Sequence, residues 1–228
     1  MRIENGLPAV RQAVVLLSGG LDSATTLYLA RKKGFRPVCL IFDYGQRHNK
    51  EMNSARRRAR KAGCHAQVLK IQLPWKGSSL LDRRLDIPAT VERAQHIPST
   101  YVPARNTIFL SFALSFAETI GARDIFIGAN ALDYSGYPDC RPEYFAAFNR
   151  LSALATKCGV EHKSVRIHAP LIDLKKSQII ALGKQLGVPY ELTWSCYRGG
   201  KQPCGRCDSC VLRAKGFSES GIPDPLLS

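Results

Sequence analysis

No stretch of the 228-residue sequence is apolar over the length that a membrane-spanning helix needs. The first ten residues, MRIENGLPAV, lack the long apolar region and the cleavage site of a secretory signal peptide. Internal repeats and low-complexity segments are absent as well. We therefore expect a cytoplasmic protein that does not bind membranes and that forms one globular domain with a small appendage.

Acidic residues are few, since 18 aspartates and glutamates accompany 33 lysines and arginines and leave a formal charge of +15. A positive field favours anionic ligands such as ATP, and it is also compatible with nucleic acid. The densest basic run, RRRARK at residues 56–61, comes without an RNA-binding motif or an aromatic stacking pattern. We interpret this run as the solvent-facing side of a helix and expect no nucleic-acid partner.

Short apolar segments alternate with longer amphipathic ones along the chain, which predicts an α/β fold with a parallel sheet. We expect strands at residues 13–17, 37–43, 66–71, 123–128 and 165–169. We expect helices at residues 24–33, 50–62, 106–119, 143–157 and 173–186, the last of them capped by Asp173. Residues 73–103 contain four prolines and predict a long loop.

Two of the expected helices differ in their apolar pattern. Residues 106–119 are apolar nearly all round, which predicts a helix buried on every side. The next helix instead has one apolar face, formed by Phe145, Phe148, Leu151 and Leu154.

Polar or glycine-rich segments follow four of the expected strands. They are SGGLDS at 18–23, DYGQRH at 43–48, NALDYSGYPDCRP at 130–142 and APLIDLKK at 169–176. Ligands of open parallel sheets bind beyond the carboxyl ends of the strands. We therefore expect these four segments to form one site.

The stretch LLSGGLDSATTL at residues 16–27 places two adjacent glycines between a strand and a helix. Backbone N–H groups and the positive end of the helix dipole would form an anion site there, best suited to phosphate. A plain tight turn is the alternative. No lysine follows the glycines, so the ordinary P-loop pattern is absent, as is GxGxxG.

Four of the eight cysteines, Cys196, Cys204, Cys207 and Cys210, lie within fifteen residues. Four closely spaced thiolates suit a tetrahedral structural zinc ion. An iron–sulfur cluster and disulfide bonds are the alternatives. The remaining cysteines are expected to be ordinary thiols.

The loop Ser18-Gly19-Gly20-Leu21-Asp22-Ser23 resembles the SGGxDS signature of the ATP-pyrophosphatase (PP-loop) family. Three further stretches resemble the 7-cyano-7-deazaguanine synthase family (QueC, also called ExsB), and this likeness extends over nearly the whole chain. They are VPARNTIFLSFALSFAE, ALDYSGYPDCRPEYFAAFN and the cysteine-rich end SC…CGRCDSCVLRAKGFSESGIPDP. Ala104 departs from the family pattern VPGRN, which has a glycine at this position.

The resemblance implies a Rossmann-like fold of the adenine nucleotide alpha hydrolase type and a ligase that forms carbon–nitrogen bonds. The implied reaction converts 7-carboxy-7-deazaguanine and ammonia into the nitrile, a precursor of queuosine, through an adenylated acid and an amide, with two ATP consumed. One alternative is a relative that stops at the amide or couples the carboxylate to another amine. A PP-loop enzyme that modifies tRNA is a second alternative.

Roles for individual residues follow from this resemblance. The loop at 18–23 is expected to hold the ATP phosphates, while Asp22 binds Mg²⁺ or orients the loop. Arg105 and Lys175 are expected to neutralise phosphate or the substrate carboxylate, with ordinary surface charge as the alternative. The expected catalytic residues are Ser18, Asp22, Ser23, Arg105 and Lys175.

The residues expected to bind ATP are Val14, Val15, Leu16, Leu17, Ser18, Gly19, Gly20, Leu21, Asp22, Ser23, Ala24, Asp43 and Gln46. Those expected to bind the purine-like base are Asn106, Asp133, Tyr134, Tyr137 and Asp139. The expected partners are small molecules and a second copy of the chain in a homodimer. We divide the chain into an ATP-binding domain with substrate loops, residues 1–190, and a zinc-binding segment, residues 191–228.

Overall fold

The computed structural model describes residues 11–89, 97–130 and 137–227. Within these ranges, five parallel strands form one sheet in the order β3-β2-β1-β4-β5. The strands are β1 Arg11–Leu16, β2 Phe35–Asp43, β3 His65–Lys70, β4 Asp124–Phe126 and β5 Arg166–His168. This arrangement confirms the expected Rossmann-like fold. It creates a ligand-binding crevice at the carboxyl edge, where the strand order reverses between β1 and β4.

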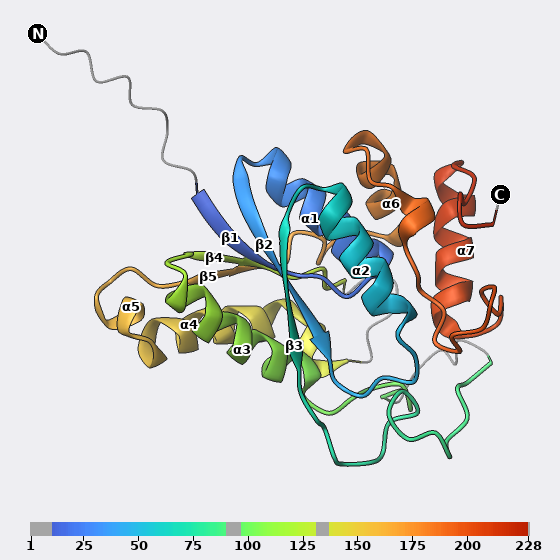
Figure 1. The fold of residues 1–228 in the computed structure, drawn as a ribbon, viewed down its shortest axis with the longest axis horizontal. Helices are drawn as coiled ribbons and strands as arrows, with labels where there is room; N and C mark the ends of the chain where they lie inside the picture. The colour runs from blue at the N-terminus through green and yellow to red at the C-terminus, as the bar shows by residue number, and fades with distance from the viewer. Residues whose placement is uncertain (1–10, 90–96, 131–136, 228) are drawn as a thin grey trace, which may run out of the picture.

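Helices cover both faces of the sheet (Figure 1). One face carries α1 Leu21–Lys32 and α2 Lys50–Lys61, and the other carries α3 Arg105–Thr119 and α4 Pro142–Ala155. The central strands are apolar without interruption over residues 13–16 of β1 and 37–42 of β2, because alternate residues are buried on opposite faces. In β1, Val15 packs toward α1 and α2, whereas Val14 packs toward α3 and α4.

Three further helices follow, α5 Lys157–Val160, α6 Lys176–Gln185 and α7 Asp208–Ser220. Asp173 does not cap α6, contrary to the prediction, because the helix begins only at Lys176. The residue directly before the helix is Lys175, and its N–H donates to Gln178 Oε1 at 2.8 Å. Helix α7 was not expected from the sequence. The buried side of α7 includes Arg213, whose guanidinium donates to the carboxylate of Asp224. Apolar residues therefore do not recur along α7 with the period that predicts an amphipathic helix.

Helix α3 is buried on one side only, and the prediction of burial all round was wrong. Ser111, Phe112 and Ser115 face outward, with Phe112 40% exposed. The helix lies in the outer layer of the molecule, where only the side toward the sheet has a partner. Its apolar composition therefore overstated its burial.

The buried face of α4 also differs from the expected one, because Leu151 and Leu154 are 46% and 79% exposed. Asn149 and Ser152 point toward the sheet instead. Asn149 Oδ1 accepts a hydrogen bond from Ile167 N at 2.8 Å, and Ser152 Oγ donates to the Val165 carbonyl at 2.8 Å. Polar side chains occupy this face because β5 is an edge strand whose backbone needs partners.

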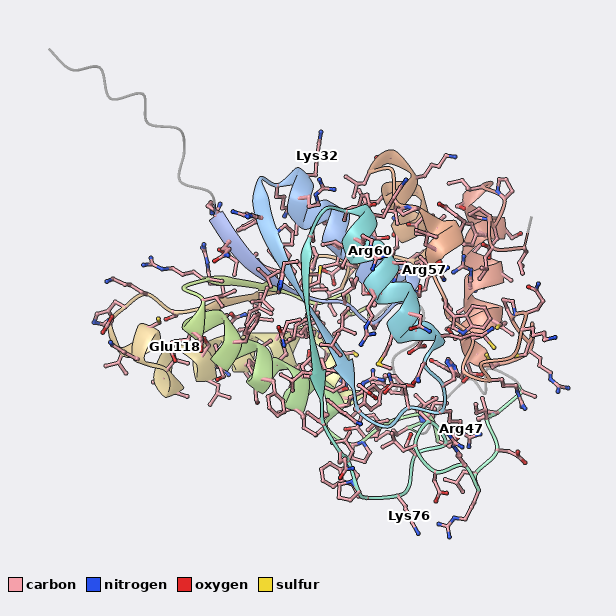
Figure 2. All side chains as sticks on the ribbon, in the orientation of Figure 1. Lys32, Arg47, Arg57, Arg60, Lys76 and Glu118 are labelled. Carbon is pink, nitrogen blue, oxygen red and sulfur yellow. The ribbon has the colours of Figure 1, made fainter. Side chains whose placement is uncertain are left out.

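The basic run of α2 is solvent-facing with one exception. Arg56, Arg57 and Arg60 are exposed, and Figure 2 shows Arg57 and Arg60 on the outer side of the helix. Arg58 is fully buried, and none of its three side-chain nitrogens has a hydrogen-bond partner among the residues that the structure describes. Burial lowers the pKa of Arg58 to about 9.

The chain after Tyr190 packs directly onto the α/β core. Trp194 N–H donates to the Gly19 carbonyl at 3.0 Å, so this segment touches the loop between β1 and α1. Arg198 and Arg47 both donate to backbone carbonyls of the long loop after β3, which has no helix or strand among its described residues. No helix in the described ranges is long and apolar enough to cross a membrane.

Candidate active site

The loop between β1 and α1 is built around hydroxyl groups and a sharp turn. Ser18 Oγ and Ser23 Oγ lie 3.1 Å apart, and Ser23 Oγ donates to the Gly20 carbonyl at 3.0 Å. Gly19 has φ +101°, and a Cβ there would overlap the carbonyl of Glu51. Only glycine fits this position, because both its conformation and its close contact exclude a side chain.

Helix α1 begins at Leu21, three residues earlier than expected, and no side chain in the described part of the chain caps its first turn. Its N–H groups therefore face the cavity with the positive end of the helix dipole. Gly128, just after β4, approaches so closely that a Cβ would lie 2.8 Å from Ser23 N. The first turn of α1 thus sits directly against the crevice.

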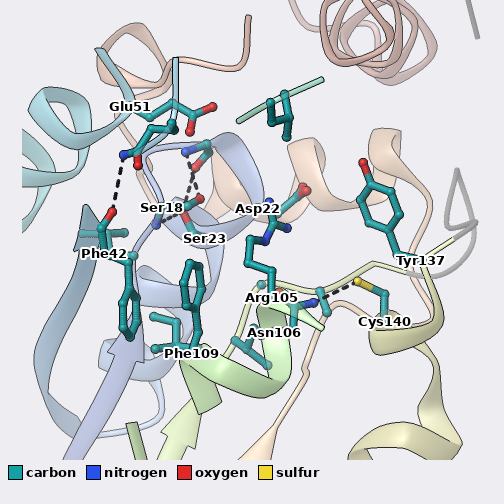
Figure 3. A pocket seen from close by; sticks show the side chains of 18 of the residues that line it. Ser18, Asp22, Ser23, Phe42, Glu51, Arg105, Asn106, Phe109, Tyr137 and Cys140 are labelled. Carbon is teal, nitrogen blue, oxygen red and sulfur yellow. Dashed lines mark hydrogen bonds between the residues drawn. The ribbon is translucent and has the colours of Figure 1, made fainter. Parts of the chain in front are cut away.

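All four polar segments that follow the strands reach one cavity of about 310 Å³. Those predicted residues that line it are Leu16, Leu17, Ser18, Gly20, Asp22, Ser23, Gln46, Arg105, Asn106 and Tyr137. Figure 3 shows Arg105 rising from the start of α3 into the same space as Asp22 and Tyr137. The expected convergence is confirmed for the described residues.

Other predicted residues lie outside the cavity lining. Val14 and Val15 are buried inside the sheet, and Leu21 and Ala24 pack against α6. Gly19 packs against the backbone of Glu51. Asp43, Asp139 and Lys175 do not line the cavity either. Asp133 and Tyr134 fall outside the described residues.

Lys176, the neighbour of Lys175, is the lysine that lines the cavity. Its Nζ donates to both carboxylate oxygens of Asp22, at 2.8 and 2.7 Å. Lys175 is exposed and directly precedes α6. The sequence pointed to this segment, and within it Lys176, not the predicted Lys175, lines the cavity.

Asp139 holds the start of α3. Its Oδ2 accepts from Asn106 N–H at 2.9 Å, and Asn106 Nδ2 donates to the Asp139 carbonyl at 3.0 Å. These bonds satisfy a free donor at the helix end. Asn106 and Asp139, both predicted to bind the base, thus fix the start of the helix that carries Arg105.

Arg105 is surrounded by hydroxyl and thiol groups. Burial would lower the pKa of its guanidinium, but the facing Tyr44, Tyr137 and Cys140 raise it, so the net shift is upward. Burial in turn raises the pKa of Tyr44 and of Tyr137. The site therefore contains a permanent cation beside neutral phenols.

Glu51, in the first turn of α2, lines the cavity and was missed in the sequence. Burial raises the pKa of its carboxyl group to about 7, against the opposing effect of Arg105 and Arg58. The sequence signal that could have identified Glu51 is its position three residues after the DYGQRH segment. The basic residues around it led us to interpret this stretch only as a solvent-facing helix.

The four clustered cysteines have the geometry of a metal site. Their sulfur atoms all lie within 4.8 Å of one another, and the Sγ atoms of Cys204 and Cys210 are 4.0 Å apart. Zn–S bonds of about 2.3 Å in a tetrahedron place sulfurs about 3.8 Å apart, so the cluster is compatible with zinc. Cys204 N–H and Cys207 N–H donate to cluster sulfurs, each at 3.4 Å. None of the eight cysteines, all of which lie in the described ranges, forms a disulfide bond.

Comparison with known proteins separates the family from the wider fold. A family model described as "Queuosine biosynthesis protein QueC" matches residues 12–221. The chain belongs to the QueC family. A 7-cyano-7-deazaguanine synthase from Anaeromyxobacter sp. (strain Fw109-5) is 55% identical, over 95% of this chain and 96% of its own length. The enzyme of the same name from Thermoplasma acidophilum is 53% identical, over 95% and 91%.

Solved structures share the fold of this QueC family member at low sequence identity. A 4-thiouridine synthetase, in complex with RNA and ATP, superposes with a TM-score of 0.51 at 21% identity, covering 91% of this chain and 53% of that one. A predicted tRNA methyltransferase subunit from Methanocaldococcus jannaschii gives 0.50 at 14% identity, covering 94% and 90%. These two likenesses establish the fold alone.

Proposed function

We propose that the protein is a carbon–nitrogen ligase of queuosine biosynthesis that converts 7-carboxy-7-deazaguanine and ammonia into 7-cyano-7-deazaguanine at the expense of ATP. The observation that carries this function is the identity of 52–55% to curated 7-cyano-7-deazaguanine synthases over about 95% of the chain. The cavity at the carboxyl edge of the sheet supplies the place for the reaction. No finding favours the alternative activities.

The reaction requires two activations of a poor electrophile. The substrate carboxylate attacks the α-phosphorus of ATP, pyrophosphate leaves, and ammonia then displaces AMP to give the amide. In the second round the amide oxygen is adenylated. Loss of AMP and of the remaining N–H proton forms the C≡N bond.

Residues 18–23, here called the phosphate loop, are proposed to stabilise the leaving pyrophosphate. The uncapped first turn of α1 and the hydroxyls of Ser18 and Ser23 provide hydrogen-bond donors where negative charge develops. Lys176 adds a cation that Asp22 holds in place. Arg105 is proposed to neutralise the substrate carboxylate or the α-phosphate.

Mg²⁺ is proposed as a counter-ion of the ATP phosphates. From the sequence, Asp22 was expected either to bind Mg²⁺ or to orient the phosphate loop. Because both of its oxygens accept from Lys176, we favour the orienting role.

We propose that Cys196, Cys204, Cys207 and Cys210 bind one structural zinc ion, because four protein ligands leave no position for substrate. Residues 191–228 would then form a zinc-binding segment attached to the domain of residues 1–190. The contact of Trp194 with Gly19 places this segment against the phosphate loop.

We further propose a homodimer in the cytoplasm that needs no nucleic acid. The exposed apolar side chains of Phe112 on α3 and Leu154 on α4 support a protein contact on that side of the sheet. Light scattering of the purified protein tests this, and a monomer at micromolar concentration would refute it.

The experiment that tests the activity is incubation with ATP, ammonium and 7-carboxy-7-deazaguanine, followed by mass analysis. The nitrile together with AMP and pyrophosphate is expected. Accumulation of the amide, or of a conjugate with another amine, would instead identify one of the alternative ligases.

A further inference from the structure

Glu51 places an unengaged carboxylate in the active-site cavity. No hydrogen bond or ion pair joins its carboxylate to another described residue, although Arg105 acts on it electrostatically. The other acidic residue in the lining, Asp22, is already paired with Lys176. Both oxygens of this half-buried carboxylate are therefore available to accept hydrogen bonds from a ligand in the cavity.

The position of Glu51 is fixed by its backbone. Its carbonyl packs against Gly19 so closely that a Cβ at Gly19 would overlap it. Figure 3 shows its carboxylate projecting from the α2 side into the space above the phosphate loop.

Aromatic and charged groups from several elements face this carboxylate. Tyr44 directly follows β2 and Tyr197 directly follows Cys196, and both tyrosines line the cavity and interact electrostatically with Glu51. Arg105 on α3, Arg58 on α2 and the thiol of Cys196 complete its electrostatic neighbours. The carboxylate therefore shares the cavity with flat apolar surfaces, which suit a ring.

The chemistry of the possible ligand groups narrows the choice. A carboxylate would repel phosphate. An ammonium ion beside Glu51 would be repelled by the cation of Arg105, which is an electrostatic neighbour of the same carboxylate. The edge of adenine offers one amine beside an acceptor nitrogen. The edge of a guanine-type base offers two parallel N–H donors, which match the two oxygens of a carboxylate.

We propose that Glu51 binds the guanine-type edge of the substrate, accepting the ring N1–H and the exocyclic amine, with the rings of Tyr44 and Tyr197 beside the base. This inference rests on the proposed function and moves to Glu51 the base recognition expected of Asp133 and Asp139. Asp139 is used to hold α3 instead.

Glu51→Gln tests the proposal, because the amide retains the shape but offers a donor where an acceptor is needed. Titration calorimetry with 7-carboxy-7-deazaguanine and with its analogue lacking the exocyclic amine measures the discrimination. We expect the wild type to prefer the amine-bearing ligand by about 100-fold or more, because the ligand without the amine leaves one oxygen of the Glu51 carboxylate without a donor in the complex. The variant should retain less than about 10-fold preference, with ATP affinity unchanged.

Glu143→Gln is the matched control, because Glu143 is also the second residue of its helix but is exposed on α4. It should keep the wild-type preference. If Glu51→Gln keeps that preference, or loses affinity only for ATP, Mg²⁺ or ammonium, the proposal is wrong. A wild-type protein that binds neither deazapurine would refute the proposed function as well, whereas nitrile production with unaltered discrimination refutes this inference alone.

Discussion

Lys176 Nζ lies within 2.8 Å of both carboxylate oxygens of Asp22, although 154 residues separate the two in the chain. The pair joins the first turn of α1 to the first turn of α6 at the edge of the cavity. It offsets a negative charge that would otherwise repel phosphate, and it restricts a long flexible cation. We therefore propose that the ion pair prepares the phosphate loop for an anion.

Lys176→Ala should lower kcat/KM by about 100-fold, as expected for the loss of one electrostatic contact to developing charge. Lys175→Ala is the control and should remain close to wild type, because that side chain is exposed outside the cavity. Steady-state release of pyrophosphate measures both. Equal effects of the two substitutions would contradict the assignment.

Asp22→Asn should likewise reduce turnover by on the order of 100-fold while the fold is retained. The neutral amide cannot balance the charge of Lys176, so the lysine is released. Circular dichroism checks the fold and product formation checks the rate. A variant with a near-normal kcat would count against this role.

Ala104→Gly should stabilise the protein by up to about 1 kcal/mol. Ala104 has φ 52° and ψ 26°, a left-handed conformation that costs an alanine more than a glycine. Ala147→Gly, at an exposed position inside α4, should instead destabilise by about 1 kcal/mol. Denaturant melts compare the two, and a shift in the same direction for both would exclude the conformational explanation.

Arg58→Met should raise Tm by several degrees, because a buried cation without hydrogen-bond partners is replaced by an apolar chain of similar length. The gain should shrink above about pH 9, where the buried guanidinium can lose its proton. The folded-state pKa lies below its usual value, so the cost of burial is greatest at lower pH. Thermal melts at pH 7 and pH 10 test both statements, and an unchanged or lower Tm at pH 7 would disprove them.

Cys207→Ser should lose the bound metal and lower Tm, whereas Cys158→Ser, outside the cluster, should do neither. Elemental analysis of the wild type should find about one zinc per chain. An iron–sulfur absorption band would show that the four thiolates hold a cluster in place of zinc. Full stability without metal would contradict a structural role.

Local patterns in the sequence were sufficient for the sheet, the phosphate loop and the cysteine cluster. Strands buried on both faces are continuously apolar, and a Gly-Gly turn between a strand and a helix lets backbone N–H groups approach an anion closely. Cys196 lies eight residues before Cys204, but its ligand type already marked it as part of the cluster. In each case the physical cause acts over a few neighbouring residues.

The tertiary structure decided which charged side chain of a segment enters the site. Lys175 precedes α6 in an extended conformation, whereas Lys176 is the first residue of the helix, and the rotation of α6 turns the Lys176 side chain toward the cavity. The packing of α6 against α1 and α7 sets that rotation. The same reason explains why Arg58 is buried within a basic run and why Glu51 faces the cavity. Their orientation depends on contacts between helices and the sheet, and these contacts join parts of the chain too distant for any local pattern to record.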